Sequence, residues 1–429
     1  MSAKSSARPF LPIRALRSSL ARDRRSGGNN RRAPAGRLDR RSKLLLAVNG
    51  LFGAANALSG TFVNVYLWKT SHDLALIGWF AVATHLANAA TFVLAGKWVK
   101  EKNNLHSLRL GVGLSALFYL AVLMLGERAA RFVLPLGAVQ GMAFGFFWLA
   151  FNVVYFEVTG PDDRDRFNGW AGLIGSLSGM VAPWASGLII TRMADTQGYR
   201  VIFAVSLAVF LIGAVLSFFL RRRAVHGKYD WTYGFVRMRR KGSPWRSIGP
   251  ALMSQGVREG VFAFLIGLMV YTAAQDEAKV GDYWLITSAV GLISFWLGGK
   301  FIRQRFRSPV MFIGAAAMVA VIFPFFLDVN YATLLIFGIG TALAMPLFTI
   351  PMTSTVFDTI GRDRDSAEHR VEYVVLRELG LTLGRLLGTL AFIAVVARDQ
   401  SAPVLNWTLF AIGLFPFFTW LFMRSLLRR

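Results

Sequence analysis

Twelve nearly continuous apolar runs divide this chain, and their length constrains its fold more than any other feature. Each run has about 18 to 27 residues, the length that an α-helix needs to cross roughly 30 Å of hydrocarbon. The segments between them are short, so no folded soluble domain fits. We therefore expect an all-α integral membrane protein with twelve transmembrane helices. The runs cover residues 44–67, 75–96, 108–125, 132–156, 168–191, 201–220, 248–274, 281–301, 309–327, 331–356, 371–397 and 402–423.

The placement of the basic residues predicts the orientation of the chain. The net charge is +25, with 48 Lys and Arg residues. When the N-terminus is placed in the cytoplasm, 38 of these residues fall in cytoplasmic segments and 7 in external loops. This bias follows the positive-inside rule. We therefore expect a multi-pass protein of the cell membrane with both termini cytoplasmic. The basic charge then serves topology, and no nucleic-acid partner is expected.

The residue types exclude several kinds of chemistry. The chain has no cysteine, which excludes disulfides, thiolate metal sites and a cysteine nucleophile. Its five histidines have no paired metal-ligand spacing, and no nucleophile and base stand at a catalytic spacing. We predict no metal, no cofactor and no enzymatic activity.

Two segments rich in basic residues frame the apolar runs. The first 43 residues hold thirteen Lys and Arg among Ser, Gly and Pro, a composition that cannot bury a core. We interpret them as a disordered tail, although a transit peptide or a misassigned start would have the same composition. The predicted domains are a tail at 1–43, a six-helix bundle at 44–220, a cytoplasmic linker at 221–247, a second six-helix bundle at 248–423 and a basic C-terminal tail at 424–429.

Charged residues interrupt two of the apolar runs. Arg258 and Glu259 lie near the middle of 248–274, with Gln255 one turn before Glu259. A charged side chain at that depth costs about 2.5–3.5 kcal/mol on the translocon scale, so it normally faces a partner or a polar cavity. Neighbouring helical residues point about 100° apart, so Arg258 and Glu259 cannot easily pair with each other.

The run 371–397 supplies the complementary charges. Glu378 and Arg385 share one helical face. We predict that Arg385 pairs with Glu259 and that Glu378 pairs with Arg258. Such pairs could serve only to hold two helices together. Alternatively, one arginine meets an anionic substrate group, or Glu259 carries a coupling proton.

Further polar residues mark the first half of the chain. Asn49, Asn56 and Asn64 share a stripe with Gly53 and Gly60, which indicates either close helix packing or the wall of a hydrated path. His85 could shuttle a proton or be a structural histidine. The other polar candidates on this path are Gln140 and Asn152.

The second half of the chain repeats the first. Gly78 and the Gly96-Lys97 pair recur as Gly281 and Gly299-Lys300, 203 residues later, and the pattern around Glu157 recurs around Asp358 with an offset of 201. We interpret this as a parallel repeat of two six-helix halves.

Twelve spans in two such halves, with a long basic central linker, resemble the major facilitator superfamily over residues 44–423. Leu94-Ala95-Gly96-Lys97 stands where the family carries G-x-L-A-D-R-x-G-R-K, so Gly96 replaces an aspartate, and Leu297-Gly298-Gly299-Lys300 departs in the same way. Gln140-Gly141 retains part of a helix-4 pattern without its arginine. Residues Ser178 to Gly187 carry a degraded form of a helix-5 pattern from antiporters.

The resemblance implies a central cavity lined by the first, fourth, seventh and tenth helices, open to each side in turn. The expected conformational residues are Lys97 and Lys300, the acidic residues Glu157 and Asp358 that could pair with them or with nearby arginines, and the helix-bending prolines Pro183, Pro346 and Pro351.

The leading hypothesis is a secondary transporter that moves a small molecule by alternating access, as a monomer in the bilayer, with protons as the coupling ion and export as the favoured direction. A lipid or lipid-linked glycan flippase on the same scaffold is the second hypothesis. A membrane sensor or scaffold without transport is the third.

Overall fold

The computed structural model describes residues 38–159, 161–193, 196–220, 228–361 and 368–427. The chain divides into two compact units, residues 1–40 and 41–429. Most of the predicted N-terminal tail, up to residue 37, lies outside the described residues. Everything below concerns the second unit.

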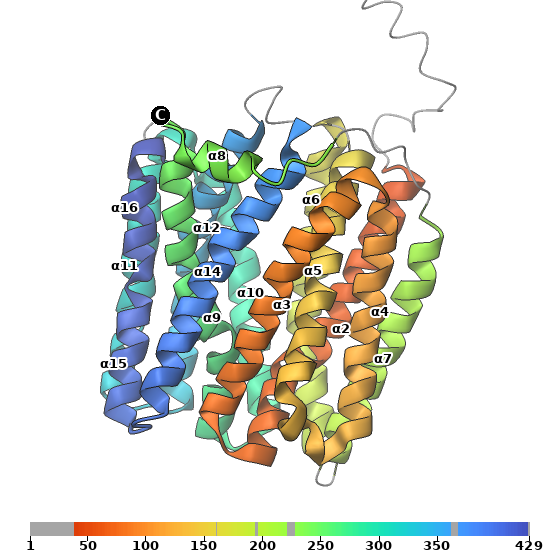
Figure 1. The fold of residues 1–429 in the computed structure, drawn as a ribbon. Helices are drawn as coiled ribbons and strands as arrows, with labels where there is room; N and C mark the ends of the chain where they lie inside the picture. Colours follow the sequence, from red (N-terminus) through yellow and green to blue (C-terminus); the bar gives the residue numbers. More distant parts are fainter. Residues whose placement is uncertain (1–37, 160, 194–195, 221–227, 362–367, 428–429) are drawn as a thin grey trace, which may run out of the picture. The chain divides into compact units, whose positions relative to one another are not determined.

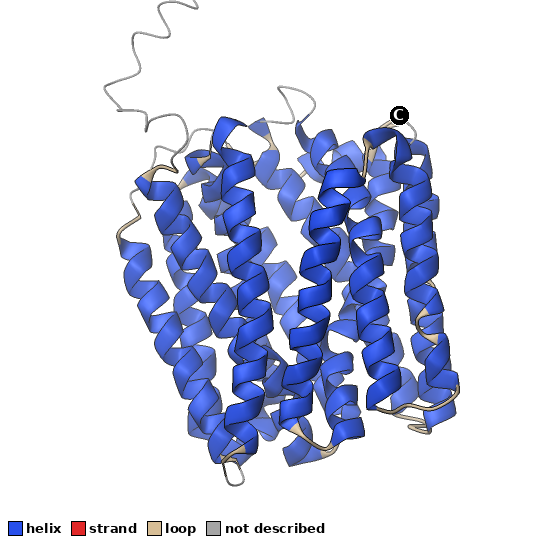
Figure 2. Ribbon diagram, turned by 180° about the vertical axis from the view of Figure 1, so that it is seen from behind, coloured by secondary structure: helices blue, strands red, loops and turns tan. Residues whose placement is uncertain are grey.

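All regular structure among the described residues is helical (Figure 2). Six long helices occupy the first half of the chain (Figure 1): α2 (Arg40–Ser71), α3 (Leu74–Glu101), α4 (Asn104–Leu125), α5 (Val133–Val158), α6 (Pro161–Thr191) and α7 (Gln197–Phe218). The second half contains α9 (Trp245–Ala274), α10 (Glu277–Phe301), α11 (Arg307–Ala320), α12 (Tyr331–Gly361), α14 (Arg370–Val396), α15 (Ala402–Gly413) and α16 (Phe415–Leu427). A short helix, α8 (Tyr233–Arg239), lies in the linker between the halves.

Each predicted apolar run coincides with helical structure, which bears out the all-α membrane architecture. Within the described part of the chain, eleven helical stretches are long and apolar enough to cross a membrane. One of them, residues 104–155, contains both α4 and α5, joined by the 3₁₀ turn Gly126–Phe132. The helices also extend past the runs into charged residues, as α2 does at Arg40, because a hydropathy pattern misses helical turns that reach the headgroup region.

Two of the runs form broken helices. The run 309–327 gives α11, a break after Ala320 and the 3₁₀ turn Phe323–Phe326. The run 402–423 breaks at Leu414 into α15 and α16. Pro324 and Pro416 follow these breaks, and each lacks the N–H that would continue the helical hydrogen bonds.

Glycine rows bring specific helices into close contact. On α5, a Cβ added at Gly141 would lie 2.1 Å from the carbonyl oxygen of Thr84 on α3. On α14, a Cβ at Gly384 would lie 1.9 Å from the carbonyl oxygen of Met253 on α9. Small residues are the usual means by which membrane helices approach each other, because lipid offers no hydrophobic drive between them.

Two helix pairs form the most extensive contacts between the first half of the chain and the second. α3 packs against α14, and α6 packs against α10. The α3–α14 contact includes Gly78, whose added Cβ would lie 2.6 Å from Ile393. The α6–α10 contact includes Gly187, whose added Cβ would lie 2.4 Å from the carbonyl oxygen of Glu277.

The linker packs on the helical bundle. Tyr233 stacks on His369 with ring centroids 3.8 Å apart, and Trp245 stacks on Tyr373 at 4.9 Å. Trp231 remains exposed. Helix α8 and the C-terminal end of α16 lie at the same end of the bundle, which we call the linker end (Figure 1).

We predict that Gly384→Val destabilises the fold, because a side chain there must push α9 and α14 apart. Overpacking of this kind lowers the free energy of unfolding by about 1–3 kcal/mol. It should therefore lower the melting temperature of the detergent-solubilised protein. The matched control is Gly113→Val, because a Cβ at Gly113 meets no atom within 4 Å. Equal melting temperatures for the two variants would contradict the close contact.

Candidate functional site

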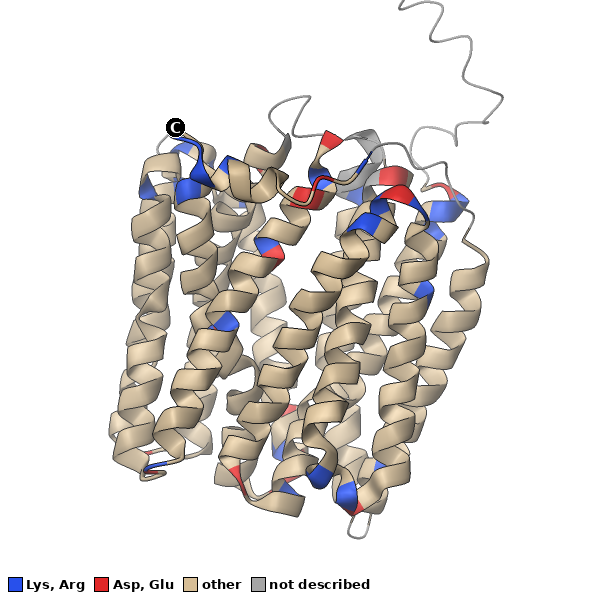
Figure 3. Cartoon of the chain, viewed as in Figure 1, with Lys and Arg blue, Asp and Glu red and all other residues tan. Residues whose placement is uncertain are grey.

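Charged residues gather at the two ends of the helices, and few lie between them (Figure 3). Among those few, three residues from two helices form a cluster: Glu259 on α9, and Glu378 and Arg385 on α14. Because water is scarce at this depth, such charges are stabilised by direct partners. We call these three residues the central cluster.

Arg385 contacts both carboxylates of the central cluster. Its Nη2 lies 3.0 Å from Oε2 of Glu259, and its Nη1 lies 2.7 Å from Oε1 of Glu378. The side chain of Glu378 is 12% exposed, that of Arg385 20% and that of Glu259 29%. Two carboxylates therefore share one guanidinium, which gives the cluster a formal charge of −1 when both are ionised.

Two amides complete the network. Gln255 Nε2 donates to Oε1 of Glu259 at 2.7 Å, one turn away on α9. Asn88 Nδ2, on α3, donates to Oε1 of Glu378 at 2.9 Å. This last bond joins the first half of the chain to the second. Asn88 is buried, and its Oδ1 has no hydrogen-bond partner.

The predicted pair of Glu259 with Arg385 is confirmed. The predicted pair of Arg258 with Glu378 is wrong, because Glu378 bonds to Arg385 on its own helix instead. The two residues are seven apart and share one face of α14, so their long side chains span the two turns between them. Arg258 is left without a carboxylate.

Arg258 is buried against an aromatic ring. The residue is 7% exposed, and its guanidinium carbon lies 4.5 Å from the ring centroid of Phe262, one turn further along α9. Its Nε and Nη2 atoms have no hydrogen-bond partner. A cation over an aromatic face is attracted to the ring, but that attraction leaves the N–H donors unsatisfied.

The asparagine stripe of α2 borders open space. A Cβ added at Gly53 or Gly60 meets no atom within 4 Å. The interpretation that α2 packs closely against another helix through these glycines is therefore wrong. Asn56 is half-buried and donates to the carbonyl oxygen of Phe52 on its own helix. Asn49 and Asn64 are half-buried as well. This face of α2 therefore has no close helix neighbour at Gly53 or Gly60.

The other polar candidates have different surroundings. His85 is half-buried, within electrostatic reach of Arg385. Gln140 is buried, and Asn152 donates to the carbonyl oxygen of Trp148 on its own helix. Of these three residues, His85 is the one within electrostatic reach of the central cluster.

Ionic contacts also join the halves at both ends of the bundle. At the linker end, Lys100 on α3 pairs with the buried carboxylate of Glu372 on α14. At the opposite end, Lys69 on α2 pairs with Glu277 on α10 at 2.8 Å, and Tyr199 donates to the same carboxylate at 2.8 Å. Both pairs bridge helices from different halves.

The comparisons with known proteins agree with this architecture. The family model of the Major Facilitator Superfamily matches residues 44–389. The chain belongs to the Major Facilitator Superfamily. A relative from Bacillus subtilis (strain 168), "Uncharacterized protein YqgE", is 39% identical over 372 residues, which cover 86% of each chain.

Solved structures of the superfamily share the fold. The nucleoside transporter NupG is 15% identical with a TM-score of 0.69, over 90% of this chain and 99% of that one. A D-xylose–proton symporter is 16% identical with a TM-score of 0.65, over 89% of this chain and 97% of that one. The protein is therefore a multi-pass membrane transporter by family, and this superfamily is not one of enzymes.

The superfamily's loop aspartate is replaced at Gly96, and the linker fills its place. A Cβ at Gly96 would lie 2.9 Å from the hydroxyl oxygen of Tyr229. The backbone N–H of Tyr229 donates to Glu101 at 2.8 Å, and that of Asp230 donates to Glu372 at 3.1 Å. The linker thus contacts both α3 and α14 beside the Lys100–Glu372 pair.

The protonation states of the linker residues favour this contact. Burial, with the nearby carboxylates of Glu372 and Asp230, raises the pKa of Tyr229 to about 12. Hydrogen bonds from the backbone and side chain of Thr232 lower the pKa of Asp230 below its ordinary value. At neutral pH the phenol is therefore uncharged and Asp230 is ionised.

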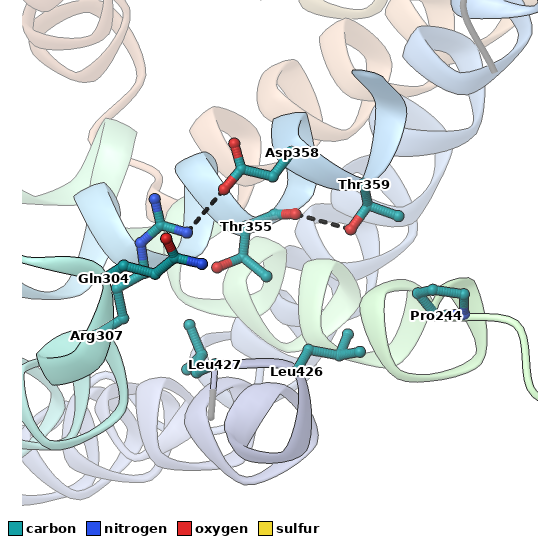
Figure 4. A pocket seen from close by; sticks show the side chains of 8 residues that line it. All are labelled: Pro244, Gln304, Arg307, Thr355, Asp358, Thr359, Leu426 and Leu427. Atoms are coloured by element: carbon teal, nitrogen blue, oxygen red, sulfur yellow. Dashed lines mark hydrogen bonds and ion pairs between the residues drawn. The ribbon is translucent and has the colours of Figure 1, made fainter. Parts of the chain in front are cut away.

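The predicted conformational residues find partners other than the two lysines. Asp358 pairs with Arg307 at 2.8 Å, as expected for a nearby arginine, at the edge of a pocket of about 440 Å³ (Figure 4). Glu157 accepts a hydrogen bond from Asn104 at 2.7 Å. Lys97 is exposed, and Lys300 lies over the ring of Trp296 at 5.4 Å.

The three prolines lie inside their helices, Pro183 in α6 and Pro346 with Pro351 in α12. The carbonyl oxygen of Pro183 would lie 2.9 Å from a Cβ added at Gly281, at the α6–α10 contact. No group of three potential metal ligands occurs among the described residues.

Sequence reasoning missed the residues that join the halves at their ends. Lys69, Lys100, Glu277 and Glu372 stand at the boundaries of the apolar runs, where a charge is ordinary and attracts no notice. The signal that could have found them is the position of each acid, at the first turn of a helix in the second half.

We predict that cysteines at positions 100 and 372 are joined by a short bis-methanethiosulfonate cross-linker in the otherwise cysteine-free chain, because the tips of the long native side chains are in contact. Cross-linking should hold the linker end closed and abolish flux, and reduction of the cross-linker's disulfides should restore it. The single variants Lys100→Cys and Glu372→Cys are the controls. Mobility shifts on a gel with an intervening cleavage site report the cross-link; failure to form it would contradict the contact.

Proposed function

We propose that this protein is a secondary active transporter of a small molecule, driven by protons and working by alternating access as a monomer in the cell membrane. The central cluster is the proton-binding site in this proposal. The observation that carries it is the double contact of Arg385 with Glu259 and Glu378.

The formal charge of the central cluster is balanced by one added proton. Two ionised carboxylates close to one guanidinium repel each other in a medium of low dielectric, and a proton on either one removes the excess charge. The partly exposed Glu259 offers a route for that proton. His85 and the open stripe of Asn49, Asn56 and Asn64 supply a polar path towards it.

Protonation would weaken a contact between the halves. A neutral Glu378 is a poorer acceptor for Asn88 and for Arg385 than an ionised one, because charge-assisted hydrogen bonds are roughly twice as strong as neutral ones. The Asn88–Glu378 bond joins α3 to α14. Proton binding would thereby loosen the contact of the two halves near mid-membrane.

Alternating access would use the ionic contacts at the two ends as gates. The Lys100–Glu372 pair would break when the linker end opens, and the Lys69–Glu277 pair when the opposite end opens. We place the linker end in the cytoplasm, with both termini, because the basic residues concentrate there. Residues 44–220 and 248–423 would move as the two halves.

The contacts between the halves support the proposed repeat. If the six spans of the two halves correspond in order, α3 corresponds to α10 and α6 corresponds to α14. Exchanging the halves then turns the α3–α14 contact into the α10–α6 contact. Both contacts occur. Such an exchange is what a two-fold arrangement of parallel repeats requires.

A small molecule is favoured over a lipid as the substrate. A groove of about 860 Å³ lies between α9, α14 and α15, and its lining is almost wholly apolar, from Met253 to Phe415. A flippase needs a polar route for a headgroup. The polar side chains lie instead in the central cluster. The helix-5 pattern from Ser178 to Gly187 favours export as the direction.

We predict that Glu378→Gln abolishes proton-driven flux in proteoliposomes, because a neutral amide cannot exchange a proton. Exchange of labelled substrate across the membrane without a pH gradient should continue. Flux is measured with a panel of radiolabelled small molecules, and proton movement with an internal pH-sensitive dye. The control is Glu127→Gln, at an exposed acid outside the cluster. Wild-type coupling in Glu378→Gln would refute the role of the cluster.

A second prediction concerns the Glu259–Arg385 contact. Reversal at one position alone, Glu259→Arg or Arg385→Glu, leaves like charges facing each other and should abolish flux. The double reversal restores opposite charges across the two helices, so part of the activity should return. Flux and surface expression are measured together, and no recovery in the double variant would count against the pair.

A further inference from the structure

Arg258 is a buried arginine of the membrane-spanning helices, and its guanidinium contacts no carboxylate among the described residues. Its neighbour Glu259 is held by Arg385 and Gln255. A buried charge without a partner costs several kcal/mol, so a chain that keeps one normally gains something else from it.

The unsatisfied atoms of Arg258 are arranged for one kind of ligand. Nε and Nη2 lie on the same edge of the guanidinium plane, and their N–H bonds are parallel. Two parallel donors match the two oxygens of a carboxylate, which is the geometry of a bidentate pair. Phe262 lies over a face of the guanidinium, and the two donors on this edge are buried, so a ligand would reach them in another conformation of the transport cycle.

We propose that the Nε–Nη2 edge of Arg258 binds the carboxylate of a small organic monoanion. A bidentate carboxylate would satisfy both orphaned donors at once, whereas a halide ion would accept from them at a single point. One guanidinium supplies one positive charge, so a single carboxylate neutralises it and a second negative group would be left unbalanced.

Arg258 lies on α9, the seventh of the predicted spans, which is expected to line the central cavity. The anion bound there would therefore be the transported molecule. Arg258 and Glu259 are consecutive, so their side chains point about 100° apart and serve separate sites. The anion neutralises Arg258, and one proton neutralises the central cluster. In the proton-driven export proposed above, the proton and the monocarboxylate are bound in turn and cross in opposite directions. This step alone rests on the proton-driven function proposed above.

The test is ligand-induced stabilisation of the purified full chain. Butyrate and benzoate are compared with butyramide and benzamide, their uncharged isosteres, and with sodium chloride at equal ionic strength. We expect the carboxylates to raise the melting temperature in a saturable way and the amides and chloride to leave it unchanged. Equal stabilisation by amide or chloride, or no stabilisation by either carboxylate, would overturn the proposal.

Variants assign the effect to the guanidinium edge. Removing one partner of a buried charge pair costs about 2–5 kcal/mol, so Arg258→Gln should weaken carboxylate binding roughly 30-fold or more. Arg258→Lys retains the charge without the parallel donors. Its affinity for carboxylates should therefore lie between that of the wild type and that of Arg258→Gln. Arg377→Gln is the matched control, because Arg377 is a second arginine on the facing helix α14, over the ring of Phe357.

If Arg258→Gln does not fold, Arg258→Lys carries the test, and unchanged carboxylate affinity in that variant would overturn the bidentate contact. The binding measurement needs no pH gradient. Carboxylate binding without proton-driven flux would therefore refute the proposed function alone. Proton-driven flux of other molecules, with no carboxylate binding, would refute this inference alone.

Discussion

The position of Arg385 between two acids is the interaction on which the interior of this protein depends. In hydrocarbon a charge must find its partner within the protein, and here one guanidinium satisfies Glu259 on α9 and Glu378 on its own helix. The glycines that let α9 and α14 approach bring these helices close enough for that contact. Packing and electrostatics therefore depend on each other: a bulkier residue at Gly384 would separate the charges as well as the helices.

The same constraint explains the state of Arg258. Because Glu378 lies on the same face of α14 as Arg385, it contacts that arginine rather than reaching across to α9. Arg258 remains with an aromatic face and two free donors. One local pairing on a single helix thus leaves the guanidinium of Arg258 without a carboxylate contact.

Much of the fold could be predicted from the sequence, because run length and basic-residue bias are strong signals in a membrane protein. The Glu259–Arg385 contact could be predicted because each charge needed a partner and helix geometry excluded the neighbouring residue. The Glu378 partner could not, because a helical face specifies direction but leaves open whether a long side chain bonds along its own helix or across. The end contacts, such as Lys100 with Glu372, depend on which helices lie side by side.

The contact of Tyr229 with Gly96 has a consequence for the amplitude of motion. The linker is held against α3 and α14 by backbone N–H groups as well as by this ring. In the proposed alternating-access cycle, a tether attached to both halves would limit how far they separate before it detaches. The missing side chain at position 96 would then make the connecting segment a stop for the opening, and the size of the molecules admitted would depend on the linker.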